Sequence, residues 1–250
     1  FYRCLRKLGM ASELMAQQHS MVHRALGTKI VLTVYGDEYF PLLSQAMKMI
    51  DGYEDRLTVN RPVSEVMAVN QAAGRTPKLV SPTTYELVKL AVHYSRENFG
   101  FNALIGPLVK LWKIGFAGAN VPSDQAIKDR LRLIDPYQVL LDDDNRTVYL
   151  EQPGMELDLG GIAKGYIADR VRDFWLAQGV PAGIINLGGN LVFIGQSPRR
   201  ADGQWIIGVQ DPQLKRGHDL ETVRQPACSA VTSGIYERFL VKDGRRYHHL

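Results

Sequence analysis

The sequence predicts an α+β fold, in which helices alternate with antiparallel hairpins. One helix face near the N-terminus is marked by apolar residues at helical spacing, namely Leu42, Leu43, Ala46, Met49, Ile50 and Tyr53. Near the C-terminus, the pair Asp243-Gly244 separates two β-rich runs, which predicts a two-residue hairpin turn. Helices mixed with such hairpins favour an α+β fold over a doubly wound sheet.

Local signals predict the remaining elements of the first half. Thr28–Tyr35 is rich in β-branched residues and is predicted to be a strand. Serine N-caps and first-turn prolines predict helix starts at Ser64, Ser81-Pro82, Pro107 and Ser123. The polar turn 142–146 predicts a hairpin of strands 137–141 and 147–150.

Residues 155–166 read as a strand that ends in Asp158, a two-glycine turn and a helix start. Apolar residues recur every four positions beyond this turn, which predicts a core-facing helix over Ile162–Ala177. Lys164 then lies in the first turn, where the helix dipole disfavours a cation by about 0.3–1 kcal/mol. Gly165 costs about 1 kcal/mol relative to Ala in a helix.

Two unfavourable residues at one helix start indicate a function for that turn. Free backbone N–H groups together with the Lys164 ammonium would suit phosphate or pyrophosphate. The alternative is a tight strand–helix turn with a solvated lysine.

A second pair of glycines, Gly188-Gly189, lies between two apolar runs and is flanked by Asn186 and Asn190. Taken alone, this pair predicts a hairpin turn. The two asparagines could donate to and accept from a ligand that lies on the turn. Beyond the central helix we expect strands at 183–187, 190–194, 204–210, 228–232, 235–241 and 245–249.

Composition excludes several classes of protein. The 250 residues are 45% hydrophobic and 22% charged, which suffices for a large core in one or two packed domains. The net charge is +4 and the basic residues are scattered, so no nucleic-acid partner is expected. Cys4 and Cys228 lie far apart and indicate neither a disulfide framework nor a zinc site. No run reaches the eighteen or so apolar residues of a transmembrane segment.

Common catalytic motifs are missing from the sequence. There is no Gly-x-x-x-x-Gly-Lys-Ser/Thr loop, no Gly-x-Ser-x-Gly elbow and no His-Glu-x-x-His helix. The dinucleotide fingerprint Gly-x-Gly-x-x-Gly is missing as well. A phosphate-handling enzyme would therefore need another cradle, which the element 158–165 offers.

Seven segments, in order, carry a resemblance to a known family. They are Ala25-Leu-Gly-Thr28, Arg56-Leu-Thr-Val-Asn-Arg-Pro-Val-Ser-Glu65, Gly106-Pro-Leu-Val-Lys-Leu-Trp112, Asp158-Leu-Gly-Gly-Ile-Ala-Lys-Gly165, Asn186-Leu-Gly-Gly-Asn190, Thr232-Ser-Gly234 and His248-His249-Leu250. Together they resemble the ApbE family of FAD:protein FMN transferases. The resemblance covers nearly the whole chain after the first twenty residues. It implies an ApbE-like two-part α+β fold with the nucleotide bound between the parts. The domain would span 21–250, after an N-terminal extension or tag-like segment over 1–20.

The resemblance also implies a role for individual residues. His249 matches a histidine that is a plausible general base for the accepting hydroxyl. Gly161 would supply a backbone carbonyl to magnesium. Contacts to the flavin nucleotide would come from Leu26, Asn60, Gly100, Phe101, Asn102, Asp158, Lys164, Ala230 and Thr232.

Two departures from the family's pattern bear on function. The sequence ends at Leu250, before the Asp and Thr that the family uses as metal ligands, and the carbonyl of Gly161 alone could not hold magnesium. We therefore expect the natural protein to continue beyond this residue. Asn60 stands where many members carry a tyrosine near the flavin, so water could reach the pyrophosphate.

These residues predict a Mg²⁺-dependent transferase whose substrate is FAD. It would pass FMN to a Ser or Thr hydroxyl of a partner flavoprotein and release AMP. Two alternatives remain: an FAD diphosphatase that yields FMN and AMP, and a catalytically silent FAD-binding protein. The N-terminal residues lack a signal-peptide core, and Cys4 lacks the neighbours of a lipidation site, which favours the cytoplasm. The resemblance would also be compatible with association with the cell envelope.

Overall fold

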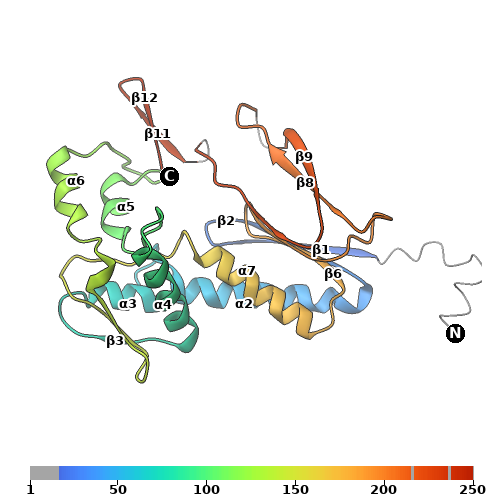
Figure 1. Ribbon diagram of the computed structural model, residues 1–250, viewed down its shortest axis with the longest axis horizontal. Coiled ribbons are helices and arrows are strands. Elements are labelled where there is room, and N and C mark those ends of the chain that lie inside the picture. The colour runs from blue at the N-terminus through green and yellow to red at the C-terminus, as the bar shows by residue number, and fades with distance from the viewer. Residues whose placement is uncertain (1–16, 215–216, 236–237, 250) are drawn as a thin grey trace, which may run out of the picture. The chain divides into compact units, whose positions relative to one another are not determined.

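The computed structural model describes residues 17–214, 217–235 and 238–249 (Figure 1). It divides the chain into two compact units. Unit 1 comprises Phe1–Ile50 and Ala168–Thr232, and unit 2 comprises Asp51–Ile167 and Ser233–Leu250. Two of the three divisions fall inside helices, α2 (Phe40–Leu57) and α7 (Ala163–Ala177), and the third follows Thr232. The units are described separately below.

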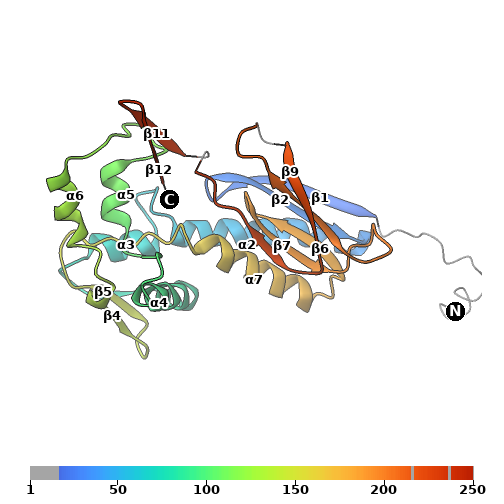
Figure 2. The ribbon, with the colours of Figure 1, turned by 45° about the horizontal axis from the view of Figure 1, so that its top comes forward.

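Unit 1 is built on a five-stranded antiparallel sheet (Figure 2). Its order is β1 (Gln18–Ala25), β2 (Thr28–Tyr35), β6 (Ala182–Asn186), β7 (Asn190–Gly195) and β10 (Ser229–Val231). A separate ribbon pairs β8 (Trp205–Gln210) with β9 (Asp219–Gln225). A short 3₁₀ turn, Asp37–Tyr39, follows β2.

The central strands of this sheet are covered on both faces. On one face, α7 places Trp175 against β6, where a methyl group on Gly183 would lie 3.1 Å from the indole ring. On the other face, Trp205 of β8 lies 5.4 Å from Phe193 and 6.0 Å from Tyr35 between ring centroids.

Unit 2 combines helices with short sheets. Its helices are the end of α2, α3 (Glu65–Gln71), α4 (Pro82–Arg96), α5 (Gly106–Trp112), α6 (Asp124–Leu131) and the start of α7. Its strands are β3 (Lys78–Leu79), β4 (Val139–Asp142), β5 (Thr147–Leu150), β11 (Phe239–Lys242) and β12 (Arg245–His248), of which β3, β5 and β4 form one sheet in that order. A 3₁₀ turn, Pro136–Gln138, precedes β4.

The mixture of helices and antiparallel sheets confirms the predicted α+β class. Ser64 and Ser123 are N-caps whose hydroxyls accept from the N–H groups of Met67 and Ala126. Ser81 occupies the N-cap position but makes no capping bond, because its hydroxyl donates to the Glu65 carboxylate at 2.8 Å.

Several element bounds differ from the predictions. The strand predicted at 137–141 begins at Val139, because the prolyl 3₁₀ turn occupies the preceding residues. The strand predicted at 235–241 is Phe239–Lys242, and residues 236–237 fall outside the described part. Strands β1, β3 and β9 were not predicted. The prediction of a strand that ends in Asp158 is wrong, because residues 155–159 form neither helix nor strand.

The predicted N-terminal extension over 1–20 stays a prediction. Residues 1–16 are outside the described part of the chain, and β1 begins at Gln18. In the residues that the structure describes, no helix is both long and apolar enough to span a membrane.

Candidate functional site

The Asp158 turn in unit 2 is held by backbone and side-chain hydrogen bonds. The Asp158 N–H donates to the Ala103 carbonyl at 2.8 Å. The Asp158 Oδ1 accepts from the Gly160 N–H, also at 2.8 Å, which closes a tight turn. A methyl group on Gly161 would lie 3.1 Å from the Phe101 ring. The structure therefore brings three predicted site residues, Phe101, Asp158 and Gly161, together.

The irregular segment that leads into Asp158 is held by a buried asparagine, Asn70 of α3. Its amide donates to the Leu157 carbonyl at 2.9 Å and accepts from the Leu157 N–H at 2.8 Å. The two residues are 87 positions apart in the sequence. Sequence reasoning missed Asn70, because no local pattern signals a contact over that separation.

The loop that carries Phe101 and Asn102 is also held by polar side chains. Asn102 donates to the Ile134 carbonyl at 2.7 Å and accepts from the Leu104 N–H at 2.8 Å. The Ala103 N–H donates to the buried Ser95 hydroxyl at 2.8 Å. The Asn102 amide is thus engaged in positioning its own loop. Gly100 lies before it, exposed, at φ +86°, a conformation that favours glycine.

The start of α7 agrees with the predicted position of Lys164. The helix begins at Ala163, so Lys164 lies in its first turn. The Lys164 side chain is half-buried. The N–H groups of Ile162 and Ala163 both donate to the Leu159 carbonyl, at 3.0 and 2.8 Å. These two donors are therefore used inside the turn and are not free for an anion.

In unit 1, two tight turns lie side by side at one end of the sheet. Leu26 and Gly27 join β1 to β2 at φ +54° and +67°. Gly188 and Gly189 join β6 to β7 at φ +70° and +93°, which identifies two type I′ hairpins. A side chain on Gly188 would overlap that of Thr28, so only glycine fits there.

Asn186 and Thr232 complete this end of the sheet, which we call the glycine-turn end. The Asn186 Oδ1 accepts from the N–H groups of Gly188 and Gly189 at 3.0 and 3.2 Å. The Thr232 N–H donates to the Gly189 carbonyl at 3.2 Å, two residues after Ala230 pairs with β7. The predicted residues Leu26, Ala230 and Thr232 therefore lie at the same end of the sheet, with β6 and β7 between Leu26 and the other two.

His249 follows the last strand, β12, of unit 2. The β11–β12 hairpin contacts α5 through Tyr247, whose ring centroid is 5.6 Å from that of Trp112. The exposed His249 places Nδ1 3.2 Å from the Arg238 carbonyl. A carbonyl oxygen only accepts, so Nδ1 is the donor in this contact, and in a neutral ring Nε2 would be the nitrogen that accepts.

Asn60 lies in the segment between α2 and α3. Its side chain is exposed, and its backbone N–H donates to the Thr58 hydroxyl at 3.1 Å. An exposed amide at this position leaves room for solvent or a ligand.

A complete metal site is not present in the described residues. They contain no group of three or more His, Cys, Asp and Glu side chains that could hold an ion. Magnesium takes near-octahedral oxygen coordination, and the predicted ligand Gly161 would supply one carbonyl oxygen. These residues alone do not fit a bound magnesium ion.

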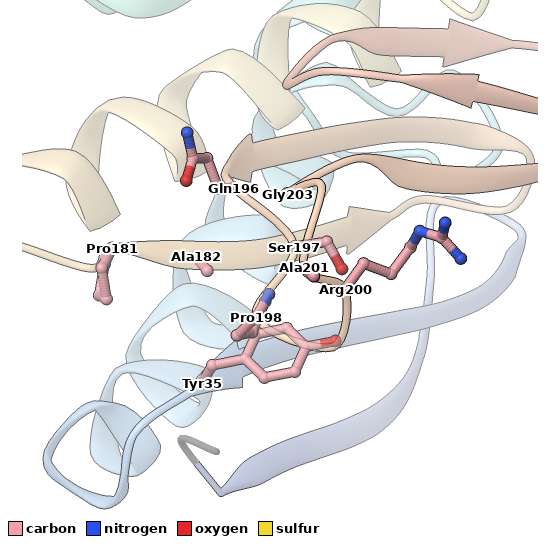
Figure 3. Close-up of a pocket in the computed structure, with 9 residues that line it drawn as sticks. All are labelled: Tyr35, Pro181, Ala182, Gln196, Ser197, Pro198, Arg200, Ala201 and Gly203. Atoms are coloured by element: carbon pink, nitrogen blue, oxygen red, sulfur yellow. The ribbon is translucent and has the colours of Figure 1, made fainter. Parts of the chain in front are cut away.

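A cavity of about 500 Å³ lies in unit 1, away from the glycine-turn end (Figure 3). Tyr35, at the last residue of β2, and Ala182, at the first residue of β6, help to line it. Arg200 extends away from Tyr35 and binds Asp202, whose pKa it lowers to about 2. Burial raises the pKa of Tyr35, so its hydroxyl stays protonated. The charged group of this cavity is thus already paired.

The chain is similar to known proteins of one family. A model of the ApbE family matches residues 26–250. A Klebsiella pneumoniae protein named FAD:protein FMN transferase is 45% identical over 226 residues, which cover 90% of this chain and 69% of that protein. A Treponema pallidum protein of the same name is 34% identical, over 94% of this chain and 69% of its own length. The crystal structure of the Thermotoga maritima ApbE protein has a TM-score of 0.83 at 31% identity, and the match covers 93% of this chain and 75% of that one.

Proposed function

This chain belongs to the ApbE family, and we propose that it is an FAD:protein FMN transferase. The observation that carries the proposal is the 45% identity, over 90% of the chain, to a relative of that name. Additional support comes from the two groups of predicted nucleotide-contacting residues, one in each unit.

In the proposed reaction, the hydroxyl oxygen of an acceptor Ser or Thr attacks the phosphorus on the FMN side of the FAD pyrophosphate. A phosphoester bond forms, the phosphoanhydride bond breaks and AMP leaves. The hydroxyl proton passes to a base, for which we propose His249, because its Nε2 is free to accept.

Residues of the chain would hold and polarise the pyrophosphate. Lys164, at the start of α7, is proposed to pair with a phosphate oxygen. Asp158 uses Oδ1 for its own turn, so Oδ2 is the oxygen that we propose contacts the nucleotide. Phe101, which lies against Gly161, would offer an aromatic face beside it.

The magnesium requirement is part of the same proposal. The ion, when bound, would neutralise charge on the phosphates. The described residues offer only the Gly161 carbonyl as a predicted ligand, so no step above depends on the ion.

The test is a flavin transfer assay. The protein is incubated with FAD and MgCl₂ in an extract of host cells that lack its gene. A new covalently fluorescent protein band in a denaturing gel, with one AMP released per flavin bound, is the expected result. The band, identified by mass spectrometry, supplies the acceptor. FAD that stays intact in the presence of a competent acceptor would contradict the proposal.

FAD hydrolysis is the second candidate, and the exposed Asn60 favours it. A hydrolase would release FMN and AMP without an acceptor. Asn60→Tyr should add stacking worth about 0.5–1.5 kcal/mol, by analogy with aromatic pairs, and slow acceptor-free release of FMN. Rapid release by the unmodified protein, with no labelled band, would make hydrolysis the main activity.

A further inference from the structure

The five-stranded sheet of unit 1 has a free edge at β10. Cys228 accepts from the Phe193 N–H at 2.8 Å, and the Thr232 N–H donates to Gly189 at 3.2 Å. In an antiparallel ladder, bonded residues alternate with residues that face the other way. Ser229 and Val231 therefore direct their N–H and C=O groups away from β7.

No other strand of the described residues pairs with that side of β10, which is last in the sheet order. Ser229 is exposed, and Val231 is 64% exposed. Unpaired backbone groups beside an exposed, uncharged, β-branched residue form a template for another strand. Natural sheets usually protect such an edge with charge or proline.

The opposite edge, β1, has a different character. The β1–β2 pairing and the bond from the Gly36 N–H to Gln17 place Gln18, Ser20, Val22 and Arg24 on its outward side. Polar residues and a cationic residue occupy most of this edge, which disfavours strand addition. Between the two edges, β10 is thus the one suited to an incoming uncharged strand.

We propose that the segment of the acceptor protein that carries the accepting hydroxyl binds as an added antiparallel strand on β10. The inference rests on the proposed transferase function. Only an extended polypeptide presents alternating N–H and C=O groups that complement those of Ser229 and Val231. An extended polypeptide is also what a protein acceptor can offer as a substrate.

Strand β10 leads to the glycine-turn end, so a segment bound along its edge would place its hydroxyl near the predicted nucleotide contacts there. The strand runs into Thr232, which binds the Gly188–Gly189 turn at the glycine-turn end. An antiparallel partner would enter at that end, so its hydroxyl residue would precede the residues that pair with β10. At about 3.4 Å per residue, a hydroxyl one to three residues before the paired segment stays near the turn.

Backbone variants test the proposal. Val231→Pro removes the outward N–H without touching a bond to β7, and proline is tolerated on a sheet edge at such a position. Val22→Pro is the matched control, because it removes an outward N–H from β1. We expect Val231→Pro to raise the KM for the acceptor at least tenfold, with FAD affinity unchanged. Val22→Pro should leave both values as in the unmodified protein.

A second variant keeps the proposal testable if Val231→Pro fails to fold. Val231→Lys puts a charge on the edge and keeps the backbone, and it should also raise the acceptor KM with FAD affinity unchanged. Flavinylation with the normal acceptor KM in a folded Val231 variant would overturn strand addition and leave the transferase function standing. An unmodified protein that transfers no flavin to any acceptor would overturn both.

Discussion

The two groups of candidate residues are positioned by different means. At the glycine-turn end of unit 1, backbone conformation and sheet register place Leu26 and Thr232. In unit 2, buried polar side chains distant in sequence place the Asp158 turn, most directly Asn70. The turns of unit 1 depend on glycines, which adopt positive φ without strain. The Asp158 turn depends on side chains such as that of Asn70, which bond backbone N–H and C=O groups that no other backbone group satisfies. The two should therefore fail in different ways when mutated.

The largest effect is expected at Asn70. Asn70→Ala would leave the N–H and C=O of the buried Leu157 without partners. At 1–3 kcal/mol for each buried unsatisfied group, the free energy of unfolding should fall by about 3–4 kcal/mol. Urea denaturation measures this change. FAD affinity should fall too, because Leu157 precedes Asp158.

Gln71→Ala is the matched control for Asn70. Gln71 is the next residue of α3, exposed, with one long hydrogen bond to the Pro62 carbonyl at 3.3 Å. Its loss should change stability by less than about 0.5 kcal/mol, as for other surface substitutions. Equal losses from the two variants would show that the buried amide of Asn70 has no special role.

The same difference explains what the sequence could reveal. The Gly188-Gly189 hairpin turn was predictable, because the requirement for positive φ is local and glycine meets it. Helix α7 was predictable from helical spacing, which put its start at Ile162, one residue before the observed start at Ala163. The roles of Asn70 and Ser95 were not, because a buried amide or hydroxyl looks like any other polar residue until the chain folds.

Strand β1 was missed for a related reason. Its residues alternate between exposed and partly buried positions, but the run contains two histidines, an arginine and a glutamine. These residues carry little β-propensity, so pairing with β2 rather than local preference makes this segment a strand.

Gly188→Ala should give the second largest effect, at the glycine-turn end. The new methyl group would overlap Thr28, and φ of +70° is strained for alanine. Overpacking and the left-handed backbone together should cost about 2–3 kcal/mol in unfolding free energy. Thr28→Ala in the same chain removes the overlapping atoms and should restore part of the loss. A double variant no more stable than Gly188→Ala would mean that backbone strain alone sets the cost.

Lys164→Ala should affect binding rather than folding. If the ammonium pairs with phosphate, its loss should weaken FAD binding by about 2 kcal/mol, as for a charge-assisted hydrogen bond. Flavin fluorescence titration measures this loss. Arg172→Ala is the control, because it removes one positive charge from the same helix at a residue paired with Asp169 and Asp173. Equal weakening in both variants would point to net charge rather than to a specific contact.

The smallest effect on the free energy of unfolding is expected at Tyr85, whose hydroxyl donates to an exposed carboxylate of unit 2. The buried ring of Tyr85 directs its hydroxyl to Asp143 at 2.8 Å, and Lys89 binds the same carboxylate at 2.7 Å. Burial, and then the bond to Asp143, raise the pKa of Tyr85 to about 12. Tyr85→Phe should cost about 1 kcal/mol, less than Asn70→Ala, because water can replace the partner of an exposed carboxylate.

The pH dependence of this contact separates it from simple loss of packing. A raised pKa in the folded state means that the stabilisation is complete below the unfolded pKa of about 10 and is lost as the pH rises towards about 12. The difference in unfolding free energy between the unmodified protein and Tyr85→Phe should therefore be constant from pH 7 to 9 and shrink above pH 10. Urea denaturation at pH 8 and pH 11 measures it. A difference that stays the same at both values would contradict the raised pKa of Tyr85, and the contrast between buried and exposed polar contacts in unit 2 would then rest on Asn70 alone.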